Sequence, residues 1–93
     1  MIFPLFQVEG QSMEPFCREG DFIFVNKFLD LKEGDIAVMR HPLTSRFLLK
    51  RIIKKRDESY WIEGDNKLAS FDSRLFGWVN KDSILGVAKV IHK

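Results

Sequence analysis

The stretch FLLKRII at residues 47–53 decides the fold class, because its composition and spacing fit a β-strand. Successive side chains of a strand point to opposite faces, so Lys50 falls on one apolar face and Arg51 on the other. One cation on each apolar face has two explanations. Either the long side chains reach along the sheet to water, or one of them is buried for a functional reason.

Other segments share the character of this stretch, being short, rich in Phe, Ile and Val, and bounded by Gly, Asp, Pro or Ser. A helical alternative is weak, because no window of a dozen residues keeps helical apolar spacing without a Gly or Pro in it. The sequence therefore predicts an all-β fold, a small curled sheet or partial barrel. The further predicted strands are residues 6–8, 21–26, 36–40, 60–63 and 86–91.

Size and charge narrow the classes of protein. The chain has 93 residues, which predicts a single domain over residues 1–93, and 45% of the residues are hydrophobic, enough to form a core. Fifteen Lys and Arg against 13 Asp and Glu give a net charge of +2. This balance favours neither a nucleic-acid partner nor an anionic membrane.

Cysteine and histidine are scarce, with one Cys (Cys17) and two His (His41 and His92). No internal disulfide is possible, and the three residues do not have the spacing of a zinc site. We expect a reducing compartment and no metal or other cofactor. Cys17 as a nucleophile lacks a neighbouring His, so a core position is the better interpretation.

The apolar runs are short. The longest, at residues 1–6 and 22–25, fall well below the roughly 20 residues of a membrane span. No basic start precedes an apolar signal segment. We therefore expect a soluble, cytoplasmic protein without a transmembrane segment. Peripheral membrane contact through Ile2, Phe3, Leu5 and Phe6 stays open.

The tripeptide EGD occurs at residues 19–21, 33–35 and 63–65. Gly supplies positive φ and Asp closes turns through its side chain, so plain turns are the preferred interpretation. A calcium site is the alternative, but the spacing is not that of an EF-hand loop. The third triplet leads into residues 66–74, here called the polar loop, which has no strand pattern and many hydrogen-bonding side chains.

Ser12 follows a predicted strand, within VEGQSMEP at residues 8–15. A serine in such a turn is usually only a hydrogen-bonding turn residue. His41 and His92 are both poorly placed to activate it, which disfavours a Ser-His-Asp triad. A buried Lys50 is an alternative base, because lost solvation favours the neutral amine. Lowering a lysine pKa from about 10.4 to between about 7 and 8 costs roughly 3 to 4.5 kcal/mol, which burial in an apolar strand can supply.

Five short motifs follow one another along the chain: GQSMEP at residues 10–15, GD at 20–21, GDIAV at 34–38, KR at 50–51 and GDNKLASFDSRLFG at 64–77. Taken in order, they resemble the conserved boxes of the type I signal peptidases, over about residues 6 to 90. The resemblance implies a β-fold serine endopeptidase with a Ser/Lys dyad, reduced to the catalytic core without a second domain, since residues 50 and 64 are only 14 positions apart. MRHP at residues 39–42 and DSRLFG at 72–77 look most like the maturation proteases of nickel-type superoxide dismutase.

The resemblance also implies roles for individual residues. Ser12 would be the nucleophile, Lys50 the general base, and Ser70 the hydroxyl that orients the lysine amine. The Ser12 backbone N–H would bind the oxyanion, and Gly10 stands where some members carry a second oxyanion-binding hydroxyl. The supporting residues would be Asp65, Asn66, Asp72 and Arg74, and the substrate-binding residues Gly10, Gln11 and Met13.

Three functions compete. The first is removal of an N-terminal leader from a protein substrate that binds as an extended strand. The resemblance implies small residues near the cut. The second is a LexA-type self-cleaving peptidase, which is disfavoured because no DNA-binding helices precede Ser12. The third is an all-β nucleic-acid or peptide-binding module that uses Trp61, Trp78 and basic residues. The basic patch from Lys50 to Arg56 is expected to be a solvated turn beyond Lys50.

Overall fold

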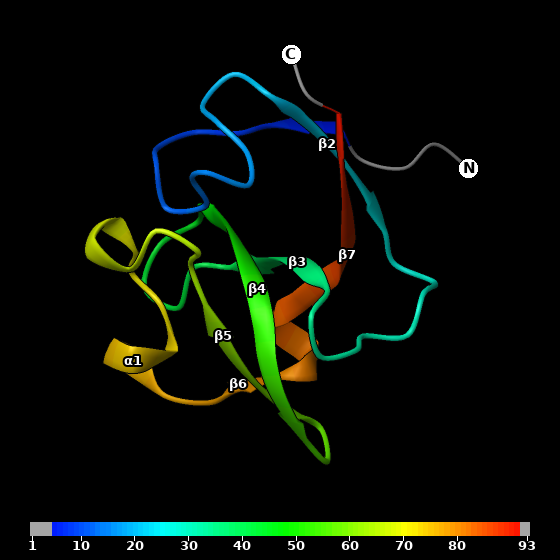
Figure 1. The fold of residues 1–93 in the computed structure, drawn as a ribbon. Coiled ribbons are helices and arrows are strands. Elements are labelled where there is room, and N and C mark those ends of the chain that lie inside the picture. The colour runs from blue at the N-terminus through cyan, green and yellow to red at the C-terminus, as the bar shows by residue number, and fades with distance from the viewer. Residues whose placement is uncertain (1–4, 92–93) are drawn as a thin grey trace.

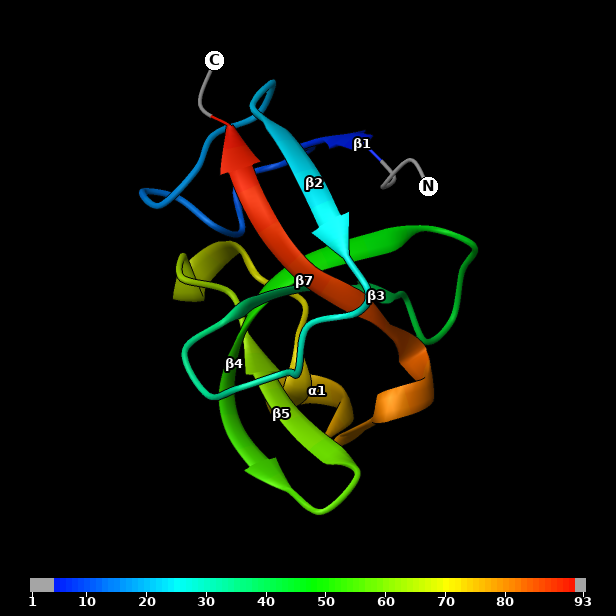
Figure 2. The same cartoon turned by 90° about the vertical axis from the view of Figure 1, so that its right-hand side faces the viewer.

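A computed structural model of the protein describes residues 5–91 (Figure 1). Its strands form a single seven-stranded sheet of order β1-β2-β7-β3-β4-β5-β6, in which every pair is antiparallel. The sheet curls into an open half-barrel, as expected for the predicted all-β class (Figure 2). The strands are β1 (Leu5–Gln7), β2 (Phe22–Asn26), β3 (Ile36–Arg40), β4 (Phe47–Arg56), β5 (Ser59–Glu63), β6 (Val79–Asn80) and β7 (Ile84–Ile91).

Six strands were predicted close to their observed bounds, and the structure adds β6 and three short helices. The helices are η1 (Lys67–Ala69), α1 (Ser73–Phe76) and η2 (Lys81–Ser83). Each has three or four residues, too few to give a periodic signal.

The prediction of a solvated turn beyond Lys50 is wrong. Residues 51–56 belong to β4, which continues to Arg56, and Arg56 pairs with Ser59 of β5. Residues 57 and 58 make the turn, and Asp57 takes a φ of 52° there. The strand extends because its backbone pairs with β5 as far as Arg56, while the basic side chains of residues 54–56 stay exposed to water.

Two groups of buried apolar side chains make the core. Strand β7 lies between β2 and β3 and contributes to both groups, Ala88 to the first and Val87 to the second (Figure 2). The serine turn, residues 10–15, is anchored through Met13, which is only 2% exposed and packs in the first group. Strands β4 and β5 are anchored in the second group through Ile52 and Ile62, both fully buried.

The EGD triplets divide into two kinds. Gly20 and Gly34 have φ of 94° and 92°, and the following aspartates accept hydrogen bonds from backbone amides three residues earlier, at 2.9 and 3.0 Å. These two triplets are the predicted turns. Gly64, in the third, does not have positive φ, and its role belongs to the site described below.

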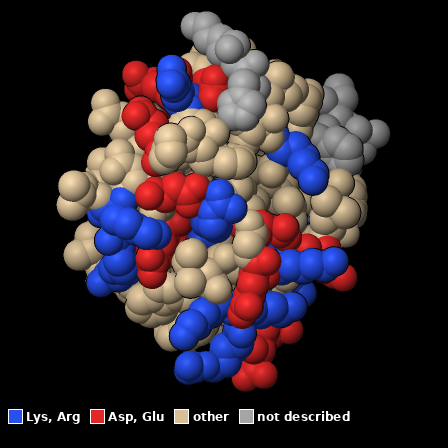
Figure 3. All heavy atoms as spheres, viewed as in Figure 1, with Lys and Arg blue, Asp and Glu red and all other residues tan. Residues whose placement is uncertain are grey.

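The surface charges and the exposed apolar residues are relevant to the expected nucleic-acid and membrane contacts. Figure 3 shows basic and acidic side chains interspersed over one face of the molecule. Within residues 5–91, no helix has the length and apolar character needed to cross a membrane. Leu5 is 56% exposed, whereas Phe6 is half-buried, and Ile2 and Phe3 lie outside the described residues.

Candidate active site

Ser12 and Lys50 line the same pocket, which has a volume of about 680 Å³. The serine turn and the end of β1 form one wall, and β4 with the β3–β4 loop (residues 41–46) forms another. Phe6 and Phe47 meet across it in an edge-to-face contact, with ring centroids 5.4 Å apart. Two residues 38 positions apart in sequence are therefore brought to one pocket, whose lining is partly apolar and partly polar.

The serine turn is held by the polar loop. The Asn66 backbone N–H donates to the Ser12 carbonyl at 2.8 Å, and the Asn66 side-chain amide donates to the Gln11 carbonyl at 3.0 Å. Among the described residues, the backbone N–H groups of Ser12 and Met13 have no hydrogen-bond partner. The turn thus carries a hydroxyl and two backbone N–H groups without a partner among the described residues, and donors of this kind can bind an oxyanion.

Lys50 lies in the middle of β4 opposite Ala37 and is only 2% exposed. Its amine makes no hydrogen bond within residues 5–91, and because no fully buried side-chain nitrogen there lacks a partner, Nζ keeps some accessible surface. Burial lowers the pKa of Lys50 to about 8, an effect that the charge of Asp72 opposes and that of Arg74 reinforces. The side chain therefore does not reach out to water as an ordinary strand lysine does, and its neutral form is populated at mildly alkaline pH.

The half-buried Ser70 and the fully buried Asp72 form a hydrogen-bond network, and the charge of Asp72 acts on Lys50. The Ser70 hydroxyl donates to Asp72 Oδ2 at 2.6 Å, and the Gly64 backbone N–H donates to both Ser70 Oγ (3.1 Å) and Asp72 Oδ2 (2.9 Å). Within the described chain, Ser70 makes no hydrogen bond to the Lys50 amine. One lone pair of the hydroxyl oxygen is still free to accept one.

Asp72 and Arg74, two of the supporting residues that the resemblance implied, form an ion pair. Arg74 Nε donates to Asp72 Oδ1 at 3.0 Å and Arg74 Nη2 to Asp72 Oδ2 at 3.2 Å. Asp72 also begins α1 by accepting the Arg74 backbone N–H at 3.1 Å. Burial raises the pKa of the carboxyl, but its hydrogen bonds from Arg74, Ser70 and Gly64 outweigh burial and hold the pKa well below its usual range. Asp72 is therefore a fixed negative charge near Lys50.

Gly64 is required by close packing. A Cβ at this position would collide with Ser70 Oγ and would lie 2.6 Å from the Ser12 carbonyl oxygen. The absent side chain lets the serine turn, the end of β5 and Ser70 meet at one point. The sequence held one signal of this role, since the third EGD triplet leads into no strand.

Arg51 has a role that the strand pattern did not reveal. Its Nε and Nη2 donate to the two carboxylate oxygens of Asp65, both at 2.8 Å, and its Nη1 donates to the Gly34 carbonyl at 3.0 Å. The guanidinium also lies 5.1 Å from the centre of the Phe16 ring. The residue next to Lys50 thus fixes the segment that carries Asn66 against β4.

The other predicted residues are placed as follows. Met13 lines the pocket, whereas Gly10 and Gln11 are exposed on the serine turn and, among the described residues, do not line it. Cys17 is 2% exposed in the core, and burial followed by neighbouring carboxylates raises its pKa to about 11. The thiol is therefore protonated and unsuited to nucleophilic attack. His92 lies outside the described residues.

The carboxylates of the EGD triplets were also the candidates for a calcium site. No group of three or more His, Cys, Asp and Glu side chains within residues 5–91 is arranged to hold a metal ion. The carboxylates of the first two EGD triplets accept backbone hydrogen bonds in their turns instead.

Fold and pocket together define a small β-domain with a serine and a buried lysine at one site, and known proteins of similar sequence are peptidases. The chain is 34% identical over 68 residues to Signal peptidase I T of Bacillus subtilis (strain 168), and 32% identical over 69 residues to Signal peptidase I P of Bacillus subtilis subsp. natto. These alignments cover 69% and 70% of this chain but only 35% and 37% of the relatives, so the chain matches little more than a third of their length.

A longer but weaker match is Signal peptidase I V of Bacillus subtilis (strain 168), 26% identical over 141 residues, which covers 92% of this chain and 83% of the relative. Residues 3–88 match the model of the Peptidase S24-like family. The chain belongs to this family, and its curated relatives make it a type I signal peptidase-like member.

Proposed function

We propose that the protein is a serine endopeptidase that removes an N-terminal leader from a protein substrate, with Ser12 as nucleophile and Lys50 as general base. The observation that carries the proposal is the burial of Lys50, 2% exposed, in the pocket that Ser12 also lines. A lysine held at that site, with a pKa lowered to about 8, supplies a neutral amine near a serine hydroxyl. Membership of a peptidase family supports the same chemistry.

In the proposed reaction, Lys50 Nζ takes the proton of Ser12 Oγ as the oxygen attacks the carbonyl carbon of the scissile peptide bond. The oxyanion accepts hydrogen bonds from the free backbone N–H of Ser12 and its neighbour Met13. The Lys50 ammonium then gives its proton to the leaving amine, and the peptide bond breaks. Water, deprotonated by the same lysine, hydrolyses the ester at Ser12.

Other residues would hold Ser12 and Lys50 in position for the reaction. Ser70 is assigned to orient the Lys50 amine, which requires one of the two side chains to move because no hydrogen bond joins them among the described residues. Asp72 fixes Ser70 and lends a negative charge that stabilises the ammonium formed in the reaction. Asn66 fixes the serine turn.

The substrate would bind as an extended strand in the apolar pocket beside the serine turn. A leader-bearing precursor co-expressed with the wild type should be shortened, and N-terminal sequencing of the product gives the cut. Precursors of nickel-type superoxide dismutase are the first substrate to test. Ser12→Ala should leave the precursor intact. Shortening that persists with Ser12→Ala, or cleavage confined to the enzyme's own chain, contradicts the proposal.

A further inference from the structure

The β3–β4 loop presents cationic and hydrogen-bond-donating side chains to the pocket, and the reaction proposed above does not use them. His41, Thr44 and Arg46 all line the pocket that holds Ser12 and Lys50. The Arg46 side chain forms no ion pair or hydrogen bond within residues 5–91. A guanidinium left without a partner at the edge of an apolar pocket is available to a ligand.

Hydrogen bonds and a ring stack hold the β3–β4 loop in place. The His41 backbone N–H donates to the Arg46 carbonyl at 2.8 Å, and the Arg46 N–H donates to Thr44 Oγ1 at 3.1 Å. The His41 ring stacks on Phe71, with centroids 4.8 Å apart and planes 11° from parallel. Because Phe71 follows Ser70, this stack ties the loop to the segment beside Lys50. Arg46 is thus presented from a backbone held at both its N–H and its carbonyl.

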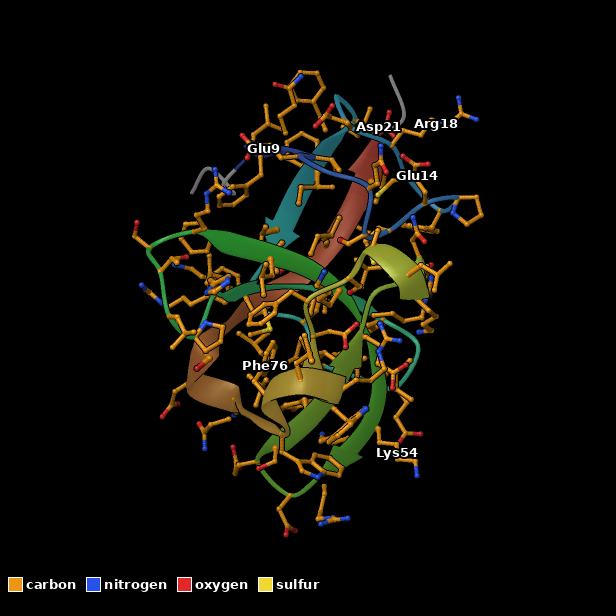
Figure 4. All side chains as sticks on the ribbon, turned by 90° about the vertical axis from the view of Figure 1, so that its left-hand side faces the viewer. Glu9, Glu14, Arg18, Asp21, Lys54 and Phe76 are labelled. Atoms are coloured by element: carbon orange, nitrogen blue, oxygen red, sulfur yellow. The ribbon has the colours of Figure 1, made fainter. Side chains whose placement is uncertain are left out.

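The donors on this wall suit a carboxylate. His41 Nδ1 accepts the Leu43 backbone N–H at 3.0 Å, so the ring proton is on Nε2, which is a donor. The Thr44 hydroxyl proton and the Arg46 guanidinium add further donors. Glu9 is the acidic residue that lines the pocket, at its serine-turn side. Figure 4 shows Glu9 above the β3–β4 loop, which forms the left edge of that view.

We propose that His41, Thr44 and Arg46 form a subsite that selects an acidic side chain in the peptide substrate, an inference that rests on the proposed function. The distance of this acidic residue from the scissile bond follows from strand geometry. Arg46 precedes Lys50 by four residues, roughly 13 Å along an extended chain. A peptide that runs beside β4 rises by the same amount per residue, so the acidic residue should lie about three to five residues from the scissile bond.

The subsite is tested with short fluorescent peptides that carry a single Asp, placed in turn at each position on both sides of the cut. Cleavage of each peptide is compared with that of a matched peptide with Asn at the same position. At one position the wild type should cleave the Asp peptide with a kcat/KM about 3- to 10-fold above the Asn peptide, the range of a partly exposed charge pair. Arg46→Gln should bring that ratio close to 1, and Arg46→Glu should favour a Lys peptide. Arg40→Gln, an exposed arginine outside the pocket lining, should keep the wild-type ratio.

Binding of the same peptides to Ser12→Ala, followed by fluorescence anisotropy, separates the two proposals. Cleavage with equal rates for Asp and Asn peptides at every position overturns the subsite and leaves the peptidase standing. Arg46-dependent preference for Asp in binding, without cleavage by the wild type, supports the subsite and overturns the peptidase. A preference for Asp that survives in Arg46→Gln also overturns the subsite.

Discussion

The Ser70 hydroxyl donates a hydrogen bond to Asp72, with 2.6 Å between Oγ and Oδ2. Because Asp72 is fully buried and takes further hydrogen bonds from Gly64 and Arg74, it fixes the direction of the Ser70 hydroxyl. Because its proton is used in this hydrogen bond, the Ser70 oxygen can only accept a hydrogen bond from any other group. This polarity is what a residue that orients an ammonium group requires.

Ser70→Ala should lower kcat by roughly 10- to 1,000-fold, about 1.4 to 4 kcal/mol of transition-state stabilisation, with little change in KM. The reason is that the hydroxyl would position Lys50 and does not contact the substrate. Steady-state kinetics on a cleaved peptide measure the effect, and circular dichroism checks the fold. Ser59→Ala, at the far end of the β4–β5 hairpin, is the matched control and should retain activity. A fully active Ser70→Ala protein would remove Ser70 from the site.

Gly64→Ala should reduce both activity and stability. The added Cβ meets the Ser12 carbonyl and the Ser70 side chain, so the serine turn must move away from β5. Overpacking of this kind costs typically 1–3 kcal/mol of unfolding free energy. We expect a urea midpoint below that of the wild type and at least about 10-fold slower cleavage, since small misplacements of a nucleophile are costly. Wild-type values for both would show that the site does not depend on this contact.

Lys50→Met should stabilise the protein at pH 7. The pKa of Lys50 is lowered from 10.5 to about 8, so between those pH values the unfolded chain holds a proton that the folded chain has released. Stability of the wild type therefore rises with pH across this window, and below pH 8 the folded state bears the cost of the charged amine. A methionine avoids a cost of up to about 3 kcal/mol.

Urea unfolding of the wild type and Lys50→Met across pH 7 to 10.5 provides the comparison. The difference in unfolding free energy should be largest at pH 7 and shrink as the pH rises. A difference that is near zero at every pH would mean that Lys50 is solvated in the folded protein.

The fold was largely predictable because strand periodicity is local. Alternation at residues 47–53 and in the other apolar segments indicated six of the seven strands. Strand β6 has only two residues and exists through its pairing with β5. Helix α1 has four residues and depends on its cap at Asp72. Such elements are stabilised by contacts distant in sequence, which a local pattern does not contain.

The site was predictable in its main residues but not in its supports. Ser12 and Lys50 were candidates from their strand and turn contexts, and both line one pocket. The Arg51–Asp65 pair and the His41–Phe71 stack join residues 14 and 30 positions apart. No spacing in the sequence marks these partners, since each is set by how the sheet curls.

The most direct test of the Ser/Lys dyad uses a serine-reactive acylating probe and needs no known substrate. Intact-mass spectrometry measures, as a function of pH, the rate at which the probe modifies Ser12. In the wild type the rate should rise with pH through about 8, as Lys50 loses its proton. Lys50→Arg should be slower by about 1,000-fold or more, because a guanidinium does not deprotonate in a protein. Ser12→Ala should not be modified. A Lys50→Arg protein, folded by circular dichroism, that is acylated at the wild-type rate would contradict the Ser/Lys dyad.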